Sequence, residues 1–226
     1  MLTSDWIREN KKSFAENFFT KSNAKSIKEP IAIFMAGLPG AGKTELSKNL
    51  LLHLPTGILR LDMDEIAEQI PGYTPQHADE FRKPATTFLN RIYDESLKRK
   101  YPIMMDGTFG SKNAIKNIKR AISHGYIAIL LYVYQDPNIA WDFTKARKKV
   151  EHRAISEDGF IETYFNLLLN LKTILTDKPD NLYIDAIIKF KDNQNYDYLP
   201  DITTQDIDNI VKETYNKDTL RKYINE

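Results

Sequence analysis

The chain has 226 residues, of which 42% are hydrophobic and 28% charged, and its formal net charge is +1. This length suits one sizeable core, and the near-zero charge gives no overall field that would favour a nucleic acid or a membrane as partner. The lack of cysteine excludes disulfides, thiolate metal sites and cysteine nucleophiles, and no apolar run approaches the roughly 18 residues of a membrane span.

Five apolar runs predict strands, and amphipathic stretches between them predict helices. The expected strands are residues 31–36, 57–62, 101–108, 126–136 and 181–188. The expected helices are residues 4–20, 43–53, 85–100, 111–123, 137–150 and 159–176, with one or two polar helices in 203–224. Pro84 is expected in the first turn of its helix. Strands that alternate with helices indicate a parallel sheet covered on both faces.

This order of elements predicts an α/β fold of three layers with a mainly parallel, five-stranded sheet. We expect a single domain over residues 1–226, whose core is residues 29–190. Residues 1–28 are expected to form a helical N-terminal extension, either as cover for the core or as a helix over the ligand site. Residues 191–226 are expected to form a polar C-terminal tail with helices.

Residues 35–46 read "MAGLPGAGKTEL" and contain the P-loop pattern G-x-x-x-x-G-K-[ST]. In this pattern the glycines let backbone N–H groups surround phosphate oxygens, and the partial positive charge of the following helix adds to the attraction. Lys43 is expected to reach the β- and γ-phosphates, and the Thr44 hydroxyl to bind Mg²⁺. The expected nucleotide-binding residues are Gly37, Leu38, Pro39, Gly40, Ala41, Gly42, Lys43, Thr44 and Glu45.

The loop does not reveal whether the terminal phosphate goes to water or to an acceptor. A GTP switch is disfavoured because no D-x-x-G element is obvious and residues 215–219 lack the N-K-x-D spacing. A motor ATPase usually needs a larger chain or a ring. Acids at the carboxyl ends of the strands beside the loop favour an acceptor, because ligands of open α/β sheets bind in that crevice.

An acceptor hydroxyl needs a carboxylate that takes its proton. Asp64 is the better candidate for this base, while Asp62 is expected to contact substrate, support the loop or cap the next helix. Asp106 is expected to bind Mg²⁺ through water, to hold the acceptor or to belong to a simple turn. Thr108 offers a further hydroxyl to a substrate.

Transfer also needs cations around the moving phosphoryl group. Arg147 and Arg153 are the candidates, but they lie six residues apart, so one straight helix would not point both the same way. A break near His152 or the closure of a flexible segment would bring them together. We expect Lys148 and Lys149 to be solvated, and His152 to lie on the surface.

The segments "IFMAGLPGAGKTEL", "LDMDEI", "MMDGT" and "HRAIS" occur in this order and resemble the zeta-toxin family of P-loop kinases over roughly residues 28–190. The resemblance implies a P-loop kinase fold, ATP or GTP as donor and Mg²⁺ as cofactor. It implies phosphorylation of a sugar hydroxyl of UDP-N-acetylglucosamine and an antitoxin partner. By position it implies Asp64 as the general base, Asp106 and Thr108 as sugar-nucleotide contacts, and Arg147 and Arg153 as the family arginines.

Three positions depart from the family pattern. Ala67 stands where several members carry a basic residue, Asn90 where a substrate-binding Glu is found, and Gly110 where an Arg follows the third strand. Asn90 remains a candidate substrate contact. Because all three concern the acceptor, the alternatives are a hydroxyl on an antibiotic, a nucleoside or a polynucleotide end. From another class, a nucleotide-dependent interaction module also stays open, and the use of ATP favours the cytoplasm.

Overall fold

The computed structural model describes residues 4–54, 57–151, 155–190, 195–211 and 214–226, with backbone alone for residues 148–151. The strands are β1 (Ile31–Ala36), β2 (Leu59–Asp62), β3 (Ile103–Asp106), β4 (Ile127–Tyr134), β5 (Leu182–Lys189) and β6 (Tyr196–Leu199). The helices are α1 (Ser4–Lys21), α2 (Lys43–His53), α3 (Met63–Glu68), η1 (Pro75–His77), α4 (Ala78–Arg99), α5 (Ala114–Ser123), α6 (Pro137–Glu151), α7 (Glu157–Thr176), α8 (Thr204–Ile210) and α9 (Lys217–Tyr223).

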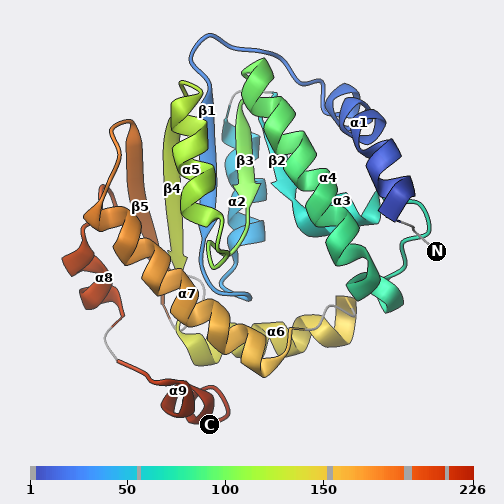
Figure 1. Cartoon of the computed structure of the whole chain (residues 1–226). Helices are drawn as coiled ribbons and strands as arrows, with labels where there is room; N and C mark the ends of the chain where they lie inside the picture. The colour runs from blue at the N-terminus through green and yellow to red at the C-terminus, as the bar shows by residue number, and fades with distance from the viewer. Residues whose placement is uncertain (1–3, 55–56, 152–154, 191–194, 212–213) are drawn as a thin grey trace.

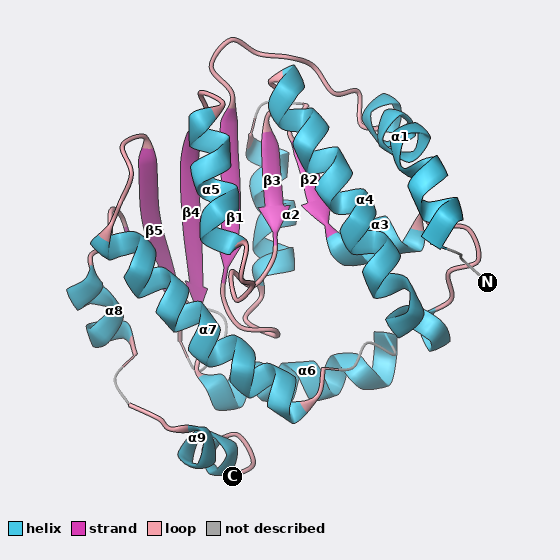
Figure 2. Ribbon diagram, in the orientation of Figure 1, coloured by secondary structure: helices cyan, strands magenta, loops and turns pink. Residues whose placement is uncertain are grey.

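The strands form one six-stranded sheet in the order β2-β3-β1-β4-β5-β6. The first five are parallel to one another, and β6 pairs antiparallel with β5. Helices α4, α5 and α7 lie in front of the sheet and α2 lies behind it, which makes three layers (Figures 1 and 2). The predicted α/β fold with a mainly parallel sheet is therefore confirmed.

The expected count of five strands was wrong, because the segment predicted as a polar tail contributes β6. This strand is short and lies at the edge of the sheet, with Tyr196 and Tyr198 more than half exposed. An edge strand of this kind buries too little apolar surface to show the sequence pattern of a core strand.

Helix α4 begins earlier than predicted. It starts at Ala78, so Pro84 lies inside the helix and not in its first turn. The Pro84 side chain is buried, and Phe88 and Ile92 on later turns of the same helix are fully buried. Burial of this apolar stripe offsets the loss of one helical hydrogen bond at the proline.

Strand β1 lies at the centre of the sheet, between β3 and β4. Its residues 32–36 are all buried, with Ala32 and Ala36 fully so. A parallel strand covered by helices on both faces has no solvent side, which explains why this segment is a continuous apolar run. The central strand therefore fixes where the loop that follows it emerges.

Helix α1 covers the outer side of α4 (Figure 1). Phe14 stacks on Phe88 with ring centroids 4.3 Å apart, and Trp6 meets the same ring edge-on at 6.2 Å. Glu16 and Arg99 form an ion pair between the two helices. These contacts show a helix that packs as cover for the core.

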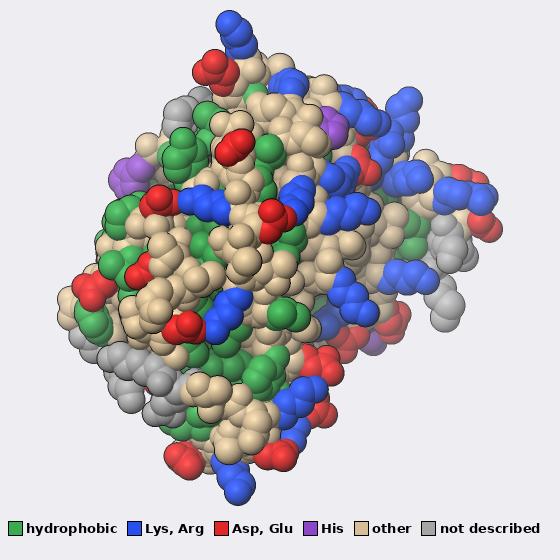
Figure 3. Space-filling model, turned by 60° about the vertical axis from the view of Figure 1, so that its left-hand side comes forward, with side chains coloured by type: hydrophobic (Ala, Val, Ile, Leu, Met, Phe, Trp, Pro, Cys, Tyr) green, Lys and Arg blue, Asp and Glu red, His purple; other side chains and the backbone are tan. Residues whose placement is uncertain are grey.

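The surface carries basic and acidic side chains scattered over the face shown in Figure 3. This mixture agrees with the formal net charge of +1. Among the described residues, no helix is both long enough and apolar enough to cross a bilayer.

Replacing Phe14 by Ala should lower the free energy of unfolding by about 2 kcal/mol, because the stacked contact with Phe88 is lost. The Tm should fall by about 4–8 °C in a thermal melt. Leu52→Ala is the control, because Leu52 is 79% exposed. Nucleotide affinity should not change, and a variant of normal stability with altered nucleotide affinity would contradict the cover role of α1.

Candidate active site

The phosphate-binding loop follows β1 at the point where the strand order reverses, since β3 lies on one side of β1 and β4 on the other. Gly37 and Gly40 have φ angles of 147° and 80°, in the region that favours glycine. A Cβ on Gly37 would collide with the Val133 carbonyl oxygen, and one on Gly40 with that of Ala140. The backbones of β4 and α6 thus press against the loop, and only glycine fits at these two positions.

Lys43 begins α2 and is 8% exposed. Its Nζ donates a hydrogen bond of 2.6 Å to the carbonyl oxygen of Leu38, inside the loop. Burial lowers the pKa of the Lys43 ammonium to about 8, although the nearby Asp106 carboxylate favours the charged form. The loop thus holds a desolvated ammonium where a phosphate would bind.

Arg60 contacts side chains of four elements, which are β2, β3, α2 and α3. Its Nη2 lies 2.5 Å from Asp106 Oδ2 and 2.8 Å from Asp62 Oδ2, and its Nε donates to Ser47 Oγ at 3.1 Å. Its Nη1 pairs with Glu65 Oε1 at 2.5 Å. The side chain of Arg60 is only 8% exposed, and that of Asp106 4%. Because these side chains are buried, their ion pairs and hydrogen bonds hold the Arg60 guanidinium and the carboxylates in a fixed geometry.

Arg60 is not among the site residues predicted from the sequence. The available signal was a charged residue inside the short strand "LRLD", next to a strand that also ends in an acid. The parallel register sets Asp62 opposite Asp106, which brings both carboxylates to the same guanidinium.

Asp62 is the N-cap of α3. Its Oδ1 accepts hydrogen bonds from the backbone N–H groups of Asp64 at 2.8 Å and Glu65 at 3.1 Å, while its Oδ2 faces Arg60. Burial raises the pKa of Asp62, and the Arg60 guanidinium partly opposes that effect. Among the roles considered for Asp62, capping is the one that its contacts describe. The cap fixes the first turn of α3, which carries Asp64.

A cavity of about 670 Å³ opens at the carboxyl ends of the central strands. The predicted site residues that line it are Pro39, Gly40, Gly42, Lys43, Thr44, Glu45, Asp62, Asp64, Asn90, Asp106, Thr108 and Arg147. Gly37, Leu38 and Ala41 belong to the same loop but do not line this cavity. The structure thus gathers the phosphate loop, the acids and Arg147 around one hollow.

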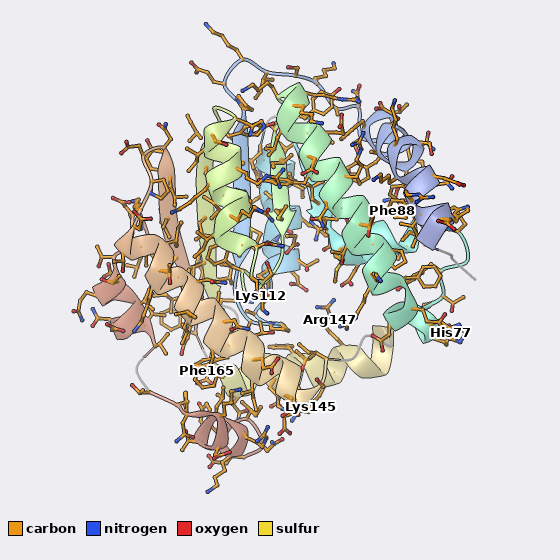
Figure 4. All side chains as sticks on the ribbon, in the orientation of Figure 1. His77, Phe88, Lys112, Lys145, Arg147 and Phe165 are labelled. Carbon is orange, nitrogen blue, oxygen red and sulfur yellow. The ribbon has the colours of Figure 1, made fainter. Side chains whose placement is uncertain are left out.

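Helix α6 crosses the carboxyl ends of the strands, from the end of β4 toward α4 (Figure 1). Arg147 rises from this helix toward the sheet (Figure 4). Together with Asp64, Arg147 also lines a second, adjoining cavity of about 210 Å³. Arg153 and His152 lie outside the described residues, as do the side chains of Lys148 and Lys149.

The three departures from the family pattern face different surroundings. Asn90 lines the main cavity, whereas Ala67 lines the smaller one. A Cβ on Gly110 would lie 3.2 Å from Thr163 Cγ2 and 3.4 Å from its carbonyl oxygen, so a side chain there would meet α7. This contact could not be predicted from the sequence, because Thr163 lies 53 residues after Gly110 in the chain.

The donor set suits Mg²⁺ bound together with phosphate. Among the described residues, no group of three or more His, Asp or Glu side chains is arranged to hold a metal ion alone. Thr44 and Asp106 both line the cavity, and Ser47, one turn after Thr44, donates to Asp106 Oδ2 at 2.7 Å. Mg²⁺ sites typically contain only one or two protein ligands, and phosphate oxygens and water complete the coordination.

Solved structures with a similar fold include one from a toxin–antitoxin system and one of a two-component complex with ATP. The chain resembles a structure from the PezAT chromosomal toxin-antitoxin system of Streptococcus pneumoniae, with a TM-score of 0.66 and 18% identity over 99% of this chain and 88% of that one. It also resembles the AvrRxo1-ORF1:-ORF2 complex with ATP, with a TM-score of 0.55 and 15% identity over 87% of this chain and 63% of that one. A search of curated protein sequences found no match.

The sequence model of the Zeta toxin family matches residues 15–203, which is most of the chain. The match includes the phosphate loop, both aspartates of "LDMDE" and the whole sheet. The protein therefore belongs to the zeta-toxin family and is a P-loop kinase, a nucleotide-dependent phosphotransferase.

Proposed function

We propose that this kinase transfers the γ-phosphoryl group of ATP or GTP to a hydroxyl group of a small molecule, with a nucleotide sugar such as UDP-N-acetylglucosamine as the first acceptor to test. The observation that carries the proposal is that Asp64 and Arg147 line the same cavity as Lys43 and Thr44. A volume of about 670 Å³ falls within the range of sites for drug-sized ligands, so the hollow is large enough for more than a triphosphate.

In the proposed reaction the acceptor oxygen attacks the γ-phosphorus, and the bond from that phosphorus to the β,γ-bridging oxygen breaks. The acceptor proton goes to the Asp64 carboxylate. Lys43 and Arg147 stabilise the charge on the transferring group and on the leaving oxygen. Mg²⁺, when bound, would neutralise charge between the β- and γ-phosphates. Thr44 is the residue that would hold it directly, and Asp106 would hold it through water.

The position of Asp64 supports its role as the base. It lies in the first turn of α3, and its backbone N–H is held by the Asp62 cap. The cap also joins this turn to Arg60 and so to β3 and α2. A general base must lie within hydrogen-bond distance of the acceptor hydroxyl. The hydrogen bonds that hold the first turn of α3 position Asp64 for this role.

The similarity to two solved structures supports ATP as the donor and an antitoxin as a protein partner. The AvrRxo1-ORF1:-ORF2 structure contains ATP, which supports ATP as the donor here. That structure is a complex, and the PezAT system is a toxin-antitoxin system, which supports an antitoxin as a partner of this chain. Binding of a purified antitoxin candidate would test the second inference.

The proposed function is tested with γ-labelled ATP, Mg²⁺ and a panel of nucleotide sugars, sugars, nucleosides and antibiotics. Asp64→Asn should lower the rate of transfer by roughly 10²–10⁴-fold, because the proton acceptor is lost. ATP affinity should stay within about twofold, as the phosphate loop is unchanged. Asp94→Asn, a surface carboxylate paired with Arg120, is the control. Full transfer by Asp64→Asn would contradict the assignment of the base.

The affinity for ATP should fall as pH rises through about 8. The Lys43 ammonium has a pKa of about 8 in the free protein because it is buried. A bound phosphate favours the charged form, so binding above this pH must take up a proton. Calorimetry at about pH 8.5 in buffers of different ionisation enthalpy should show net proton uptake. Lys43→Arg should abolish this uptake, since arginine stays charged, and proton release by the unaltered protein would contradict the prediction.

Replacing Arg60 by Met should lower the free energy of unfolding by about 3–5 kcal/mol, because it leaves Asp62 and Asp106 buried without their cation. Arg60→Lys should recover part of this loss. Chemical denaturation measures the difference. Arg8→Met is the control, since the pair of Arg8 with Asp5 is exposed and should contribute less than about 1 kcal/mol. Equal stability of Arg60→Met and Arg8→Met would show that the buried pairs do not hold these elements together.

A further inference from the structure

Two side chains outside the proposed catalytic group press against the phosphate loop. Lys189 is the last residue of β5, and Phe143 lies in α6. Both line the 670 Å³ cavity, and each stands beside one glycine of the loop. Neither is needed for the transfer step described above.

The Lys189 ammonium lies over the N-terminal end of α2. Its Nζ is 2.5 Å from the position that a Cβ on Gly42 would take, and Glu45 Oε2 is 3.7 Å from the same point. Within the ranges that the structure describes, the Lys189 side chain forms no hydrogen bond or ion pair, while its backbone belongs to the β5–β6 ladder. A cation beside the positive end of a helix is not stabilised by that helix. An anionic ligand at this point would satisfy both groups.

Phe143 is 39% exposed although it lines the cavity. Its Cβ lies 3.2 Å from the position of a Cβ on Gly40, so the side chain stands directly against the loop. It precedes Arg147 by four residues, which places both on the same face of α6. The ring therefore offers an apolar surface to the same ligand space that Arg147 enters.

The strand order separates these two residues from the acceptor side. Strands β4 and β5, which lead to α6 and Lys189, lie on one side of β1. Strands β2 and β3, which lead to Asp64 and Asp106, lie on the other side. A nucleotide with its γ-phosphate near Asp64 therefore extends its nucleoside toward β4 and β5.

We propose that Lys189 and Phe143 form the nucleoside end of the donor site, with the Lys189 ammonium on the α-phosphate and the Phe143 ring against the base. This inference rests on the proposed function only in taking a purine nucleoside triphosphate as the donor. An ammonium matches the charge of a phosphate oxygen, and an aromatic ring matches the flat face of a base.

The test measures binding of ADP and of pyrophosphate, with Mg²⁺, by calorimetry. Phe143→Ala should weaken ADP binding by about tenfold and leave pyrophosphate binding unchanged, because pyrophosphate has no base. Phe143→Leu should behave like Phe143→Ala, since it keeps apolar volume without a flat ring, and Phe143→Tyr should bind ADP like the unaltered protein. Lys189→Met should weaken ADP binding by about tenfold and reduce its dependence on salt.

Two matched controls come from the same elements. Phe190→Ala removes a phenylalanine that is 43% exposed and follows Lys189 without lining the cavity. Lys145→Met removes a lysine of α6 that pairs with Asp142 and lies two residues from Arg147, so it faces away from the cavity. Both controls should keep ADP affinity within about twofold of the unaltered protein.

The outcomes separate this inference from the proposed function. If Lys43→Met abolishes ADP binding while the Phe143 and Lys189 variants bind normally, the nucleoside subsite is wrong and the phosphate site stands. If Phe143→Ala weakens ADP and pyrophosphate equally, the ring acts through packing of the loop and the base assignment is wrong. If the unaltered protein binds neither ADP nor ATP, the proposed function fails and the subsite fails with it.

Discussion

The Arg60 guanidinium is bonded to the Asp62 and Asp106 carboxylates and to the Ser47 hydroxyl, and these groups belong to β2, β3 and α2. Because the Arg60 side chain is almost fully buried, water cannot replace these partners. Loss of the ion pairs would therefore strongly lower the free energy of unfolding. Arg60 fixes the helix of the phosphate loop relative to the two strands that carry acids. Asp62 extends the same connection to α3 and thereby to Asp64. The spacing between phosphate loop and proposed base thus depends on one buried cation.

The central position of β1 divides the site into two halves. The phosphate loop leaves β1 at the middle of the sheet, with the acids of β2 and β3 on one side and α6 and β5 on the other. Helix α6 crosses the carboxyl ends of the strands (Figure 1). Phe143 and Arg147, which we propose as ligand contacts, lie about one turn apart on this helix and both line the cavity. In this arrangement one loop can hold phosphates while separate elements recognise the two ligands. Such a division agrees with transfer between molecules better than with a site built for water alone.

Local patterns predicted much of the fold, because their physical causes are local. The apolar run 31–36 indicated a strand buried on both faces, and the glycines of 37–42 indicated the turn that the structure contains. The amphipathic pattern of residues 4–20 indicated α1, although its packing on α4 depends on the distant Phe88. The short edge strand β6 was not predicted, because it has little apolar surface to bury.

Contacts between segments that lie far apart in the chain could not be predicted from the sequence. The role of Arg60 requires the register that sets Asp62 opposite Asp106. The closeness of Phe143 and Lys189 to the loop requires α6 and β5 to meet at the end of the sheet. Gly110 reads in the sequence as a lost arginine, but the structure places α7 against it. In each case two segments far apart in the chain decide what a single residue can contact.

In the proposed function the γ-phosphate goes to an acceptor and not to water. The most direct measurement compares ADP formed with inorganic phosphate released when the protein is given ATP, Mg²⁺ and a protein-free extract of small molecules. We expect more ADP than inorganic phosphate in the presence of the extract, and we expect this excess to disappear in Asp64→Asn. Equal amounts of ADP and inorganic phosphate, with any extract and at any concentration of it, would show that the phosphoryl group goes to water.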